Sequence, residues 1–406
     1  MSLVSLPVFC AFVVVALVYW GAPARGRPWI LLLAGLVFAA TQATAFLALY
    51  LLLAGVTWWA SGRLAARRAA GSDVQVGVVA TLVFLVANLI AWKVFEVPAH
   101  TAIAAATADS RAAFPGYADV IVPVGLSFLT FRLVHVLVER TRGTRPELRS
   151  ASPSLFLAWL FFPPLLIAGP LQRFDDFVRQ QGSAPRPRLP DLNHAALRIT
   201  TGLVKKLVIA DTIGRWAQPL LLDPEAAHPG LLLVAVYAAS FQLYMDFSGY
   251  SDVAIGLGRL FGLRVPENFD WPILSSDIAT FWRKWHITLH TFFRDYVFLP
   301  VFGVRPRPLK TYLGMLVTIF LFQIWHQLSP AFVFLGLYHG LGVVAVHAFR
   351  STRRRLPGLH KAVGRTPRVV AIGITLTWFS VGNIVFMTDP GQLGVVLQRL
   401  VLGPFG

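Results

Sequence analysis

The stretch that decides the fold is residues 241–300, FQLYMDFSGYSDVAIGLGRLFGLRVPENFDWPILSSDIATFWRKWHITLHTFFRDYVFLP. It places Asp, Arg, Lys and His side chains in sequence that is otherwise apolar enough to lie in a bilayer. A charged side chain at membrane depth costs at least about 2.5–3.5 kcal/mol on insertion scales, so such groups mark a pathway or a reactive site. This stretch therefore predicts both a membrane-embedded fold and the position of its functional site.

The composition of the whole chain agrees with that interpretation. Of the 406 residues, 56% are hydrophobic and only 14% are charged. A spanning helix needs roughly 20 apolar residues, and windows of this kind recur from one end of the chain to the other. The composition predicts an all-α, polytopic integral membrane protein without a separate soluble domain.

The net charge of +17 could suggest a nucleic-acid partner, but the basic residues stand in short connections between apolar segments. These connections include Arg25 and Arg27, then Arg63, Arg67 and Arg68, then residues 140–149 and 350–368. Lys and Arg collect on cytoplasmic loops, where they also face anionic lipid. We therefore expect a multi-pass protein of the cytoplasmic membrane that binds no nucleic acid. The less basic residues 95–119 are expected outside.

Apolar runs predict helices over residues 3–20, 28–41, 44–62, 74–97, 119–140, 153–168, 194–219, 230–248, 251–262, 276–302, 311–328, 331–350, 368–388 and 391–402. Residues 29–60 suit a tight helical pair that returns the chain to the same side, because basic loops flank both ends. Pro163, Pro164, Gly169 and Pro170 interrupt another run and predict a re-entrant element beside an interior cavity.

The expected organisation is one membrane-embedded domain over residues 1–406. Its N-terminal helices occupy residues 1–118, a catalytic core occupies residues 119–350, and residues 351–406 hold a basic loop and the C-terminal helices. No internal repeat of the kind that many transporters carry is visible.

Two histidines are the strongest candidates for chemistry. His286 follows Trp285, and His326 follows Trp325, each in an apolar run. Imidazole has an unperturbed pKa near neutrality, so it can accept a proton from a hydroxyl group without much retuning. Charged residues near them in the sequence are Asp246, Asp252, Arg283 and Asp295. His339 is a third candidate that suits a packing role equally well.

Other site chemistries have weaker support. His286 and His290 have the spacing of a zinc pair, but Ile287 replaces the glutamate of a zinc protease and no third ligand is evident, so we predict no metal. Ser248 lacks the glycine two positions earlier that a nucleophile elbow requires. A transporter or flippase would also explain buried charge around a cavity, and stays an alternative.

A set of ordered motifs lies between about residues 123 and 340: PVGLSFLTF from Pro123, FFP from Phe161, AGPLQR from Ala168, GLVKK from Gly202, DFSGYSD from Asp246, FWRKWH from Phe281, and Trp325-His326. Together these motifs resemble the membrane-bound O-acyltransferase family, and in particular its bacterial branch, which acetylates alginate or D-alanylates teichoic acid.

The resemblance implies a ring of roughly 11 or more transmembrane and re-entrant helices around a central funnel or tunnel. It implies no bound cofactor: an acyl thioester, either acetyl-CoA or a charged acyl carrier protein, arrives from the cytoplasmic side. His326 matches the active-site histidine of the family, and His286 matches its second functional histidine. Candidate donors to the developing oxyanion are Trp285, Trp325, Arg283 and Gln323. Further substrate-binding candidates are Asp246, Ser248, Asp252 and Asp295.

Two positions depart from the family pattern and bear on the acceptor. Gln327 stands where a glycine usually follows the active-site Trp-His, and His290 stands where serine is usual. We expect an O-acyltransferase that moves a short acyl group, acetyl, across the membrane to a hydroxyl of a cell-envelope polysaccharide or its precursor. The alternative is carrier-dependent D-alanyl transfer to a teichoic acid-like polymer. The resemblance also implies a periplasmic or extracellular partner protein.

Overall fold

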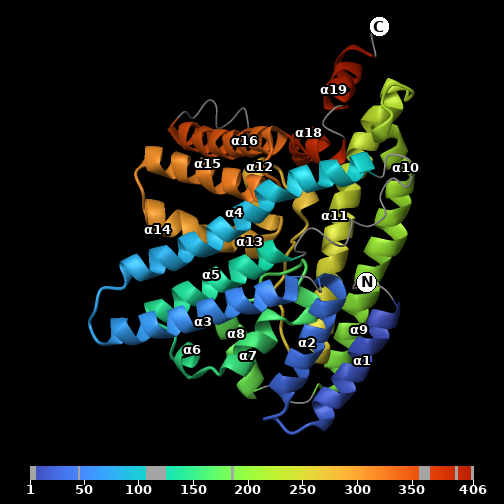
Figure 1. The fold of residues 1–406 in the computed structure, drawn as a ribbon. Coiled ribbons are helices and arrows are strands. Elements are labelled where there is room, and N and C mark those ends of the chain that lie inside the picture. Colours follow the sequence, from blue (N-terminus) through green and yellow to red (C-terminus); the bar gives the residue numbers. More distant parts are fainter. Residues whose placement is uncertain are drawn as a thin grey trace. The chain divides into compact units, whose positions relative to one another are not determined.

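The computed structural model describes residues 6–43, 46–106, 125–183, 187–355, 366–388 and 392–403, and every regular element in these ranges is helical (Figure 1). This confirms the predicted all-α class for the described residues. Among them, five helices are long and apolar enough to cross a membrane: α3 (Leu47–Ala69), α4 (Gln75–Ala106), α11 (Pro229–Leu260), α16 (Pro330–Arg355) and α18 (Arg368–Met387). The ring of helices and its funnel stay predictions.

The chain forms two compact units. The first comprises residues 1–199 and 253–266, and the second comprises residues 200–252 and 267–406. Helices α9 (Leu189–Leu203) and α11 each begin in one unit and end in the other. The predicted division into N-terminal helices, catalytic core and C-terminal helices, with boundaries at residues 118 and 350, was based on function. Units defined by packing do not test it, so it stays a prediction.

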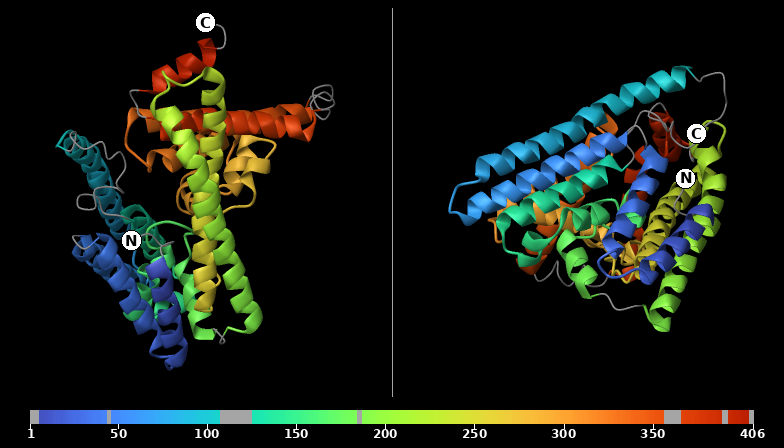
Figure 2. Two further views of the ribbon diagram at one scale, coloured as in Figure 1. Left: turned by 90° about the vertical axis from the view of Figure 1, so that its right-hand side faces the viewer. Right: turned by 60° about the horizontal axis from the view of Figure 1, so that its bottom comes forward.

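In the first unit, α1 (Leu6–Gly21) packs on α2 (Arg27–Ala43), and α3 runs beside α5 (Leu126–Arg142) (Figures 1 and 2). Residues 29–60 form two separate helices, α2 and α3, as predicted, while the return of the chain to the same side of the membrane stays a prediction. Leu64, Val74 and Leu137 form a small apolar core where α3, α4 and α5 meet. Pro123 and Val124 of the first family motif, and most of the segment expected outside, lie beyond the described residues.

The predicted break at the proline-rich segment is confirmed. Helix α7 (Pro153–Leu160) ends before a short 3-10 turn, η2 (Pro163–Leu165), and irregular chain leads on to α8 (Phe174–Ser183). Side chains of this segment are buried, including those of Phe161, Phe162 and Leu165. The buried Arg132 guanidinium donates to the carbonyl oxygens of Trp159 and Leu160, at 3.3 and 2.7 Å, which satisfies acceptors that the end of α7 leaves open. Protein thus covers the irregular backbone.

Gly125 shows why this segment needs a glycine at the start of α5. Its φ of +81° lies in the left-handed region, and a Cβ atom there would meet the Leu166 carbonyl oxygen at 2.7 Å. An alanine would therefore be strained in its backbone and would also push the segment after α7 away from α5.

In the second unit, the end of α9 continues through a π-helical segment, η3 (Val204–Ala210), into α10 (Asp211–Leu222). Helix α10 then packs along the first half of α11 (Figure 2) through a core of small and branched side chains. The members on these two helices are Ala217, Leu221, Leu232, Ala235, Val236 and Ala239.

Two helix predictions were wrong. Residues 230–248 and 251–262 form one helix, α11, because Gly249 is a packing glycine and no helix breaker: a Cβ atom there would meet the Gly202 carbonyl oxygen of α9 at 2.8 Å. Residues 276–302 form several short elements instead of one helix: α12 (Ile278–Lys284), α13 (Ile287–Phe293), the π-helical η5 (Arg294–Phe298) and α14 (Leu299–Phe302).

The remaining elements frame these short helices. In the second unit, α15 (Pro308–Ile324) packs along α16, while α12 contacts both α16 and α18. The short helix α19 (Leu393–Leu402) follows α18, and its Val396 joins the core shared by α10 and α11. In the first unit, α6 (Pro146–Ser150) packs on α8. The sequence reasoning did not anticipate α6 or α8.

Candidate active site

His286 occupies the break between α12 and α13. Its φ of +46° is left-handed, which is rare for a residue with a Cβ atom and indicates strain that the surroundings enforce. The backbone N–H of the next residue, Ile287, donates to the Asn268 carbonyl oxygen at 2.8 Å instead of continuing α12. The His286 side chain is 1% exposed and packs edge-on against Phe247, with ring centres 4.8 Å apart.

Asn268 determines which nitrogen of His286 carries the proton. Its Oδ1 atom accepts from the Thr288 hydroxyl at 2.8 Å and lies 3.0 Å from His286 Nδ1. An amide oxygen can only accept, so Nδ1 must be the donor. Asn268 is itself buried and donates from Nδ2 to the Ser251 hydroxyl at 3.3 Å. This network holds His286 in the tautomer whose lone pair is on Nε2.

His326 lies just beyond the C-terminal end of α15. Its backbone N–H donates to the Gln323 carbonyl oxygen at 3.1 Å, and its ring centre is 4.2 Å from that of Trp325. One turn earlier on α15, Phe322 reaches the His286 ring, with centres 6.1 Å apart. Burial is the largest cause that lowers the pKa of His286, and the second cause is the charge of nearby His326. The structure therefore places the two predicted histidines near the same end of α15.

Two of the predicted oxyanion donors belong to this end of α15. Gln323 is 1% exposed, and among the described residues its Nε2 group has no hydrogen-bond partner. Trp325 covers one side of His326. Trp285 lies elsewhere, in an aromatic core with Phe281 and Phe379 at ring distances of 5.5 and 5.2 Å, which suits a packing role.

Two of the acidic residues predicted to bind substrate form ion pairs with lysines. Asp252 accepts from Lys205 Nζ at 2.6 Å, and Asp246 pairs with Lys206, which also reaches Asp211 at 3.2 Å. Both lysines stand in the π-helical segment η3, where the helix is widened by an extra residue per turn. Two motifs far apart in sequence, GLVKK and DFSGYSD, are thus joined by ion pairs.

Ser248 and His339 are buried polar residues of the second unit. Ser248 is 2% exposed on α11, and its hydroxyl has no hydrogen-bond partner within the described part of the chain. His339 is fully buried on α16, with its ring centre 4.9 Å from that of Trp282. The apolar setting of His339 is that of a packing residue.

Arg283 lines a cationic cavity of about 240 Å³ between the short helices and the α15–α16 pair. Three further basic side chains face it, from His290, Arg294 and His347, and its apolar wall includes Trp282. Asp295, the last predicted substrate contact, accepts from Arg294 at 2.7 Å. His290 faces this cavity, whereas His286 packs on Asn268 and Phe247, so the two do not share one environment. The cavity suits an anionic ligand with an apolar portion.

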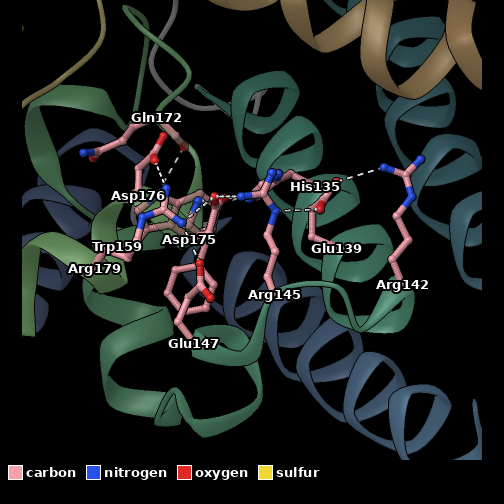
Figure 3. A network of polar contacts seen from close by, with 11 residues as sticks. His135, Glu139, Arg142, Arg145, Glu147, Trp159, Gln172, Asp175, Asp176 and Arg179 are labelled. Carbon is pink, nitrogen blue, oxygen red and sulfur yellow. Dashed lines mark hydrogen bonds and ion pairs between the residues drawn. The ribbon is translucent and has the colours of Figure 1, made fainter. Parts of the chain in front are cut away.

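A second polar cluster lies in the first unit, where α5, α6 and α8 meet (Figure 3). Arg145 donates from Nε to Glu139 at 3.0 Å and also pairs with Asp175. His135 Nε2 accepts from the Phe174 backbone N–H at 2.9 Å, so this nitrogen carries no proton and the ring is neutral. Asp175 lies 3.5 Å from the same nitrogen without changing this. Burial lowers the pKa of His135 to about 4. Part of the basic connection over residues 140–149 therefore serves internal ion pairs.

Sequence reasoning missed Asn268, Lys205 and Lys206 as site residues. Lys205 and Lys206 stand in the GLVKK motif, and an amide or an ammonium group in an apolar chain is itself a signal. Their partners come from distant segments, so a pattern along the chain cannot pair them.

Comparison with known proteins shows which family and which relatives this chain is similar to. The family model described as membrane-bound O-acyltransferase matches residues 29–362. A probable alginate O-acetylase of Azotobacter vinelandii is 34% identical over 338 residues, which cover 82% of this chain and 66% of that protein. Its counterpart in Pseudomonas aeruginosa is 34% identical over 345 residues, covering 83% of this chain and 62% of that protein.

A teichoic acid D-alanyltransferase of Streptococcus thermophilus is 29% identical over 276 residues, which cover 64% of this chain and 66% of that protein. In all three cases the matched part spans no more than about two thirds of the relative's length. The family model spans both histidines and the motifs around them, and the chain spans about two thirds of the length of these relatives.

Proposed function

Because the chain belongs to the membrane-bound O-acyltransferase family, we propose that it transfers a short acyl group, acetyl, from a thioester donor to a hydroxyl of a cell-envelope polysaccharide. The observation that carries this proposal is the placement of two imidazoles: His286 stands at the start of α13 against Phe322 of α15, with ring centres 6.1 Å apart, and His326 follows the same end of α15. A buried imidazole of fixed tautomer beside a second, less buried one is an arrangement suited to moving a proton.

In the proposed reaction, His326 takes the proton of the acceptor hydroxyl as its oxygen attacks the thioester carbonyl carbon. The tetrahedral intermediate collapses, the carbon–sulfur bond breaks, and the imidazolium returns the proton to the leaving thiolate. His286, held by Asn268 with its lone pair on Nε2, orients His326 and disfavours a lasting positive charge on the pair. No covalent enzyme intermediate is needed.

The developing oxyanion needs hydrogen-bond donors that are already in place. Gln323 supports this role because its Nε2 group is buried near the end of α15 and has no partner within the described residues. Removing one such donor in other enzymes lowers kcat by about 100-fold or more.

The cationic cavity supports a site for the donor. Acetyl-CoA and a charged acyl carrier share a phosphate on the pantetheine arm, and Arg283 and Arg294 supply guanidinium groups that pair well with phosphate. The apolar wall formed by Trp282, Phe298 and Met315 would accept the less polar part of that arm. We expect Arg283→Gln to raise the KM for the donor, whereas Arg305→Gln, an exposed arginine outside the cavity, leaves the KM unchanged.

D-alanyl transfer is the second candidate, and similarity to a teichoic acid D-alanyltransferase favours it. The chemistry at the histidines would be the same, and only the donor and acceptor would differ. The proposal places the chain in the cytoplasmic membrane as a multi-pass protein, with its donor inside, its acceptor outside, and a partner protein on the outer side that completes the transfer.

The test uses the full chain in membrane vesicles supplied with one labelled donor at a time. Label from acetyl-CoA that appears in a base-labile ester on a polysaccharide acceptor supports the first candidate. Label that appears only from a D-alanyl carrier protein supports the second. Absence of transfer from both donors, with a related acetylase active in parallel, would contradict the proposal.

A further inference from the structure

A second and larger cavity lies between α16 and α18, beside the N-terminal end of α12. Its volume is about 700 Å³, and its wall is mostly apolar. The wall residues on the two long helices are Gly342, Ala345, Val346, Phe349, Ala371, Ile374 and Trp378. Both helices are long and apolar enough to cross a membrane, so the cavity runs along two spans.

One end of this cavity is polar and positively charged. Arg350 and Arg368 line it, together with the small polar side chains of Ser276 and Thr366. Asp277 is the single acidic residue of the lining, and it accepts from Arg350 at 2.6 Å. Arg368 is exposed and forms no ion pair within the described part of the chain. One arginine charge at this end is therefore not balanced by a carboxylate.

We propose that this cavity binds an anionic phospholipid of the surrounding bilayer. Its phosphate lies between Arg368 and Arg350, and one acyl chain lies along the apolar wall between α16 and α18. A basic pocket between spanning helices on the cytoplasmic side is suited to an acidic lipid headgroup. A small soluble anion would leave the apolar wall uncovered, and a neutral lipid would leave the charge of Arg368 unbalanced.

The site connects to the candidate active site through α12. Asp277 caps α12 by accepting from the Thr280 backbone N–H at 2.9 Å, and α12 ends directly before the break that holds His286. A phosphate bound to Arg350 would thus share this arginine with the Asp277 carboxylate that caps α12. The lipid acts as a structural ligand of this helix.

The experiment measures lipid retention by the purified full chain. The protein is exchanged into nanodiscs of phosphatidylcholine containing a minor fraction of phosphatidylglycerol, and bound lipid is counted by native mass spectrometry after release. The wild type should retain one phosphatidylglycerol in preference to phosphatidylcholine. Arg368→Gln should lower that retention by about tenfold, because a charge-assisted contact to the phosphate is lost.

A second pair of variants tests the cavity without altering charge. Ala371→Trp fills the apolar wall and should abolish retention, while Gly373→Trp adds the same side chain where a Cβ atom has open space and should leave retention unchanged. Arg305→Gln controls for loss of one exposed positive charge.

Three results would overturn the proposal. The first is equal retention of phosphatidylglycerol and phosphatidylcholine by the wild type, and the second is unchanged retention in Ala371→Trp. The third is displacement of the bound lipid by acetyl-CoA, which would assign the cavity to a soluble phosphorylated ligand. Because the readout is bound lipid, failure here leaves the proposed acyl transfer untouched.

Discussion

Two buried histidines, His286 in the second unit and His135 in the first, show how similar burial serves different purposes. Both are almost inaccessible to solvent, and burial lowers the pKa of each. His135 stands among arginines and carboxylates and uses its Nε2 lone pair to accept from the Phe174 backbone. His286 stands among aromatic rings and an amide, and it is anchored through Nδ1, which leaves the lone pair on Nε2.

The difference teaches what to look for in a buried histidine. A ring whose lone pair is used by the backbone stabilises the fold and has no proton-accepting capacity left. A ring that is held through its N–H group keeps that capacity. On this criterion the cluster around His135 is structural, although it holds more charge than the surroundings of His286.

The largest expected effect is at His326. His326→Ala should lower acyl transfer by about 1000-fold, because a general base is lost while packing is little changed. Labelled acetyl transfer per folded protein, with folding judged by monodisperse elution in detergent, measures this. His194→Ala, an exposed histidine of α9, is the matched control and should keep full activity. Activity within a few-fold of wild type in His326→Ala would remove it from the role of base.

The second expected effect lies in the ionic cluster and concerns stability. Asp175 is 1% exposed and pairs with Arg145 and Arg179, so Asp175→Asn should lower the free energy of unfolding by about 3 kcal/mol. Activity per folded molecule should stay unchanged, since the cluster is structural. Asp176→Asn removes a carboxylate that is 46% exposed and should lower stability by less than about 1 kcal/mol. Thermal unfolding in detergent distinguishes the two, and equal losses would contradict the assignment.

A third change tests the anchor of His286. Asn268→Ala removes the acceptor of Nδ1 and should lower the rate of transfer by about tenfold through misorientation of the ring. Asn268→Asp keeps an acceptor there but adds a negative charge, which favours the imidazolium and raises the pKa of His286. Its pH–rate profile should therefore shift to higher pH, because the neutral ring is recovered only above the raised pKa. An unshifted profile would mean that His286 does not take part.

The smallest effect is the pH dependence of stability due to His135. Its pKa is about 4 in the folded chain and about 6.5 when unfolded. The unfolded state binds a proton first as the pH falls below 6.5, so the contribution to stability is complete above that pH and is lost towards pH 4. His135→Gln keeps an acceptor for the Phe174 N–H and should show a smaller fall in Tm between pH 7.5 and 5.5. Parallel curves would rule out this contribution.

Sequence predicted the helical class, most helices and the break near Pro163, because apolar periodicity and the effect of proline depend on neighbouring residues only. It did not predict the break at His286, since residues 276–302 have the apolar pattern of one helix and the hydrogen bond that ends α12 comes from Asn268. The continuity of α11 through Gly249 was missed for a similar reason: whether a glycine interrupts a helix or lets another helix approach depends here on Gly202 of α9.

For the candidate site, the sequence likewise identified single residues but not their partners. The two histidines were chosen from residue type and setting, and the structure places both near the end of α15. The lysine partners of Asp246 and Asp252 were not predicted, because neither helix segment alone indicates which residue of the other segment it pairs with. Charge identity is visible in a sequence, whereas charge pairing is a property of the packed chain.

The widened turn over residues 204–210 has a consequence for how this helix tolerates insertions and deletions. Deleting one residue there would restore ordinary helical winding while the turns on either side keep their direction, because the extra residue is accommodated within the widened turn itself. The change would stay local, but the two ammonium groups on this turn would shift relative to their separate carboxylates on α11. A deletion of one residue at this point should therefore weaken the ion pairs to α11 while α10 keeps its packing.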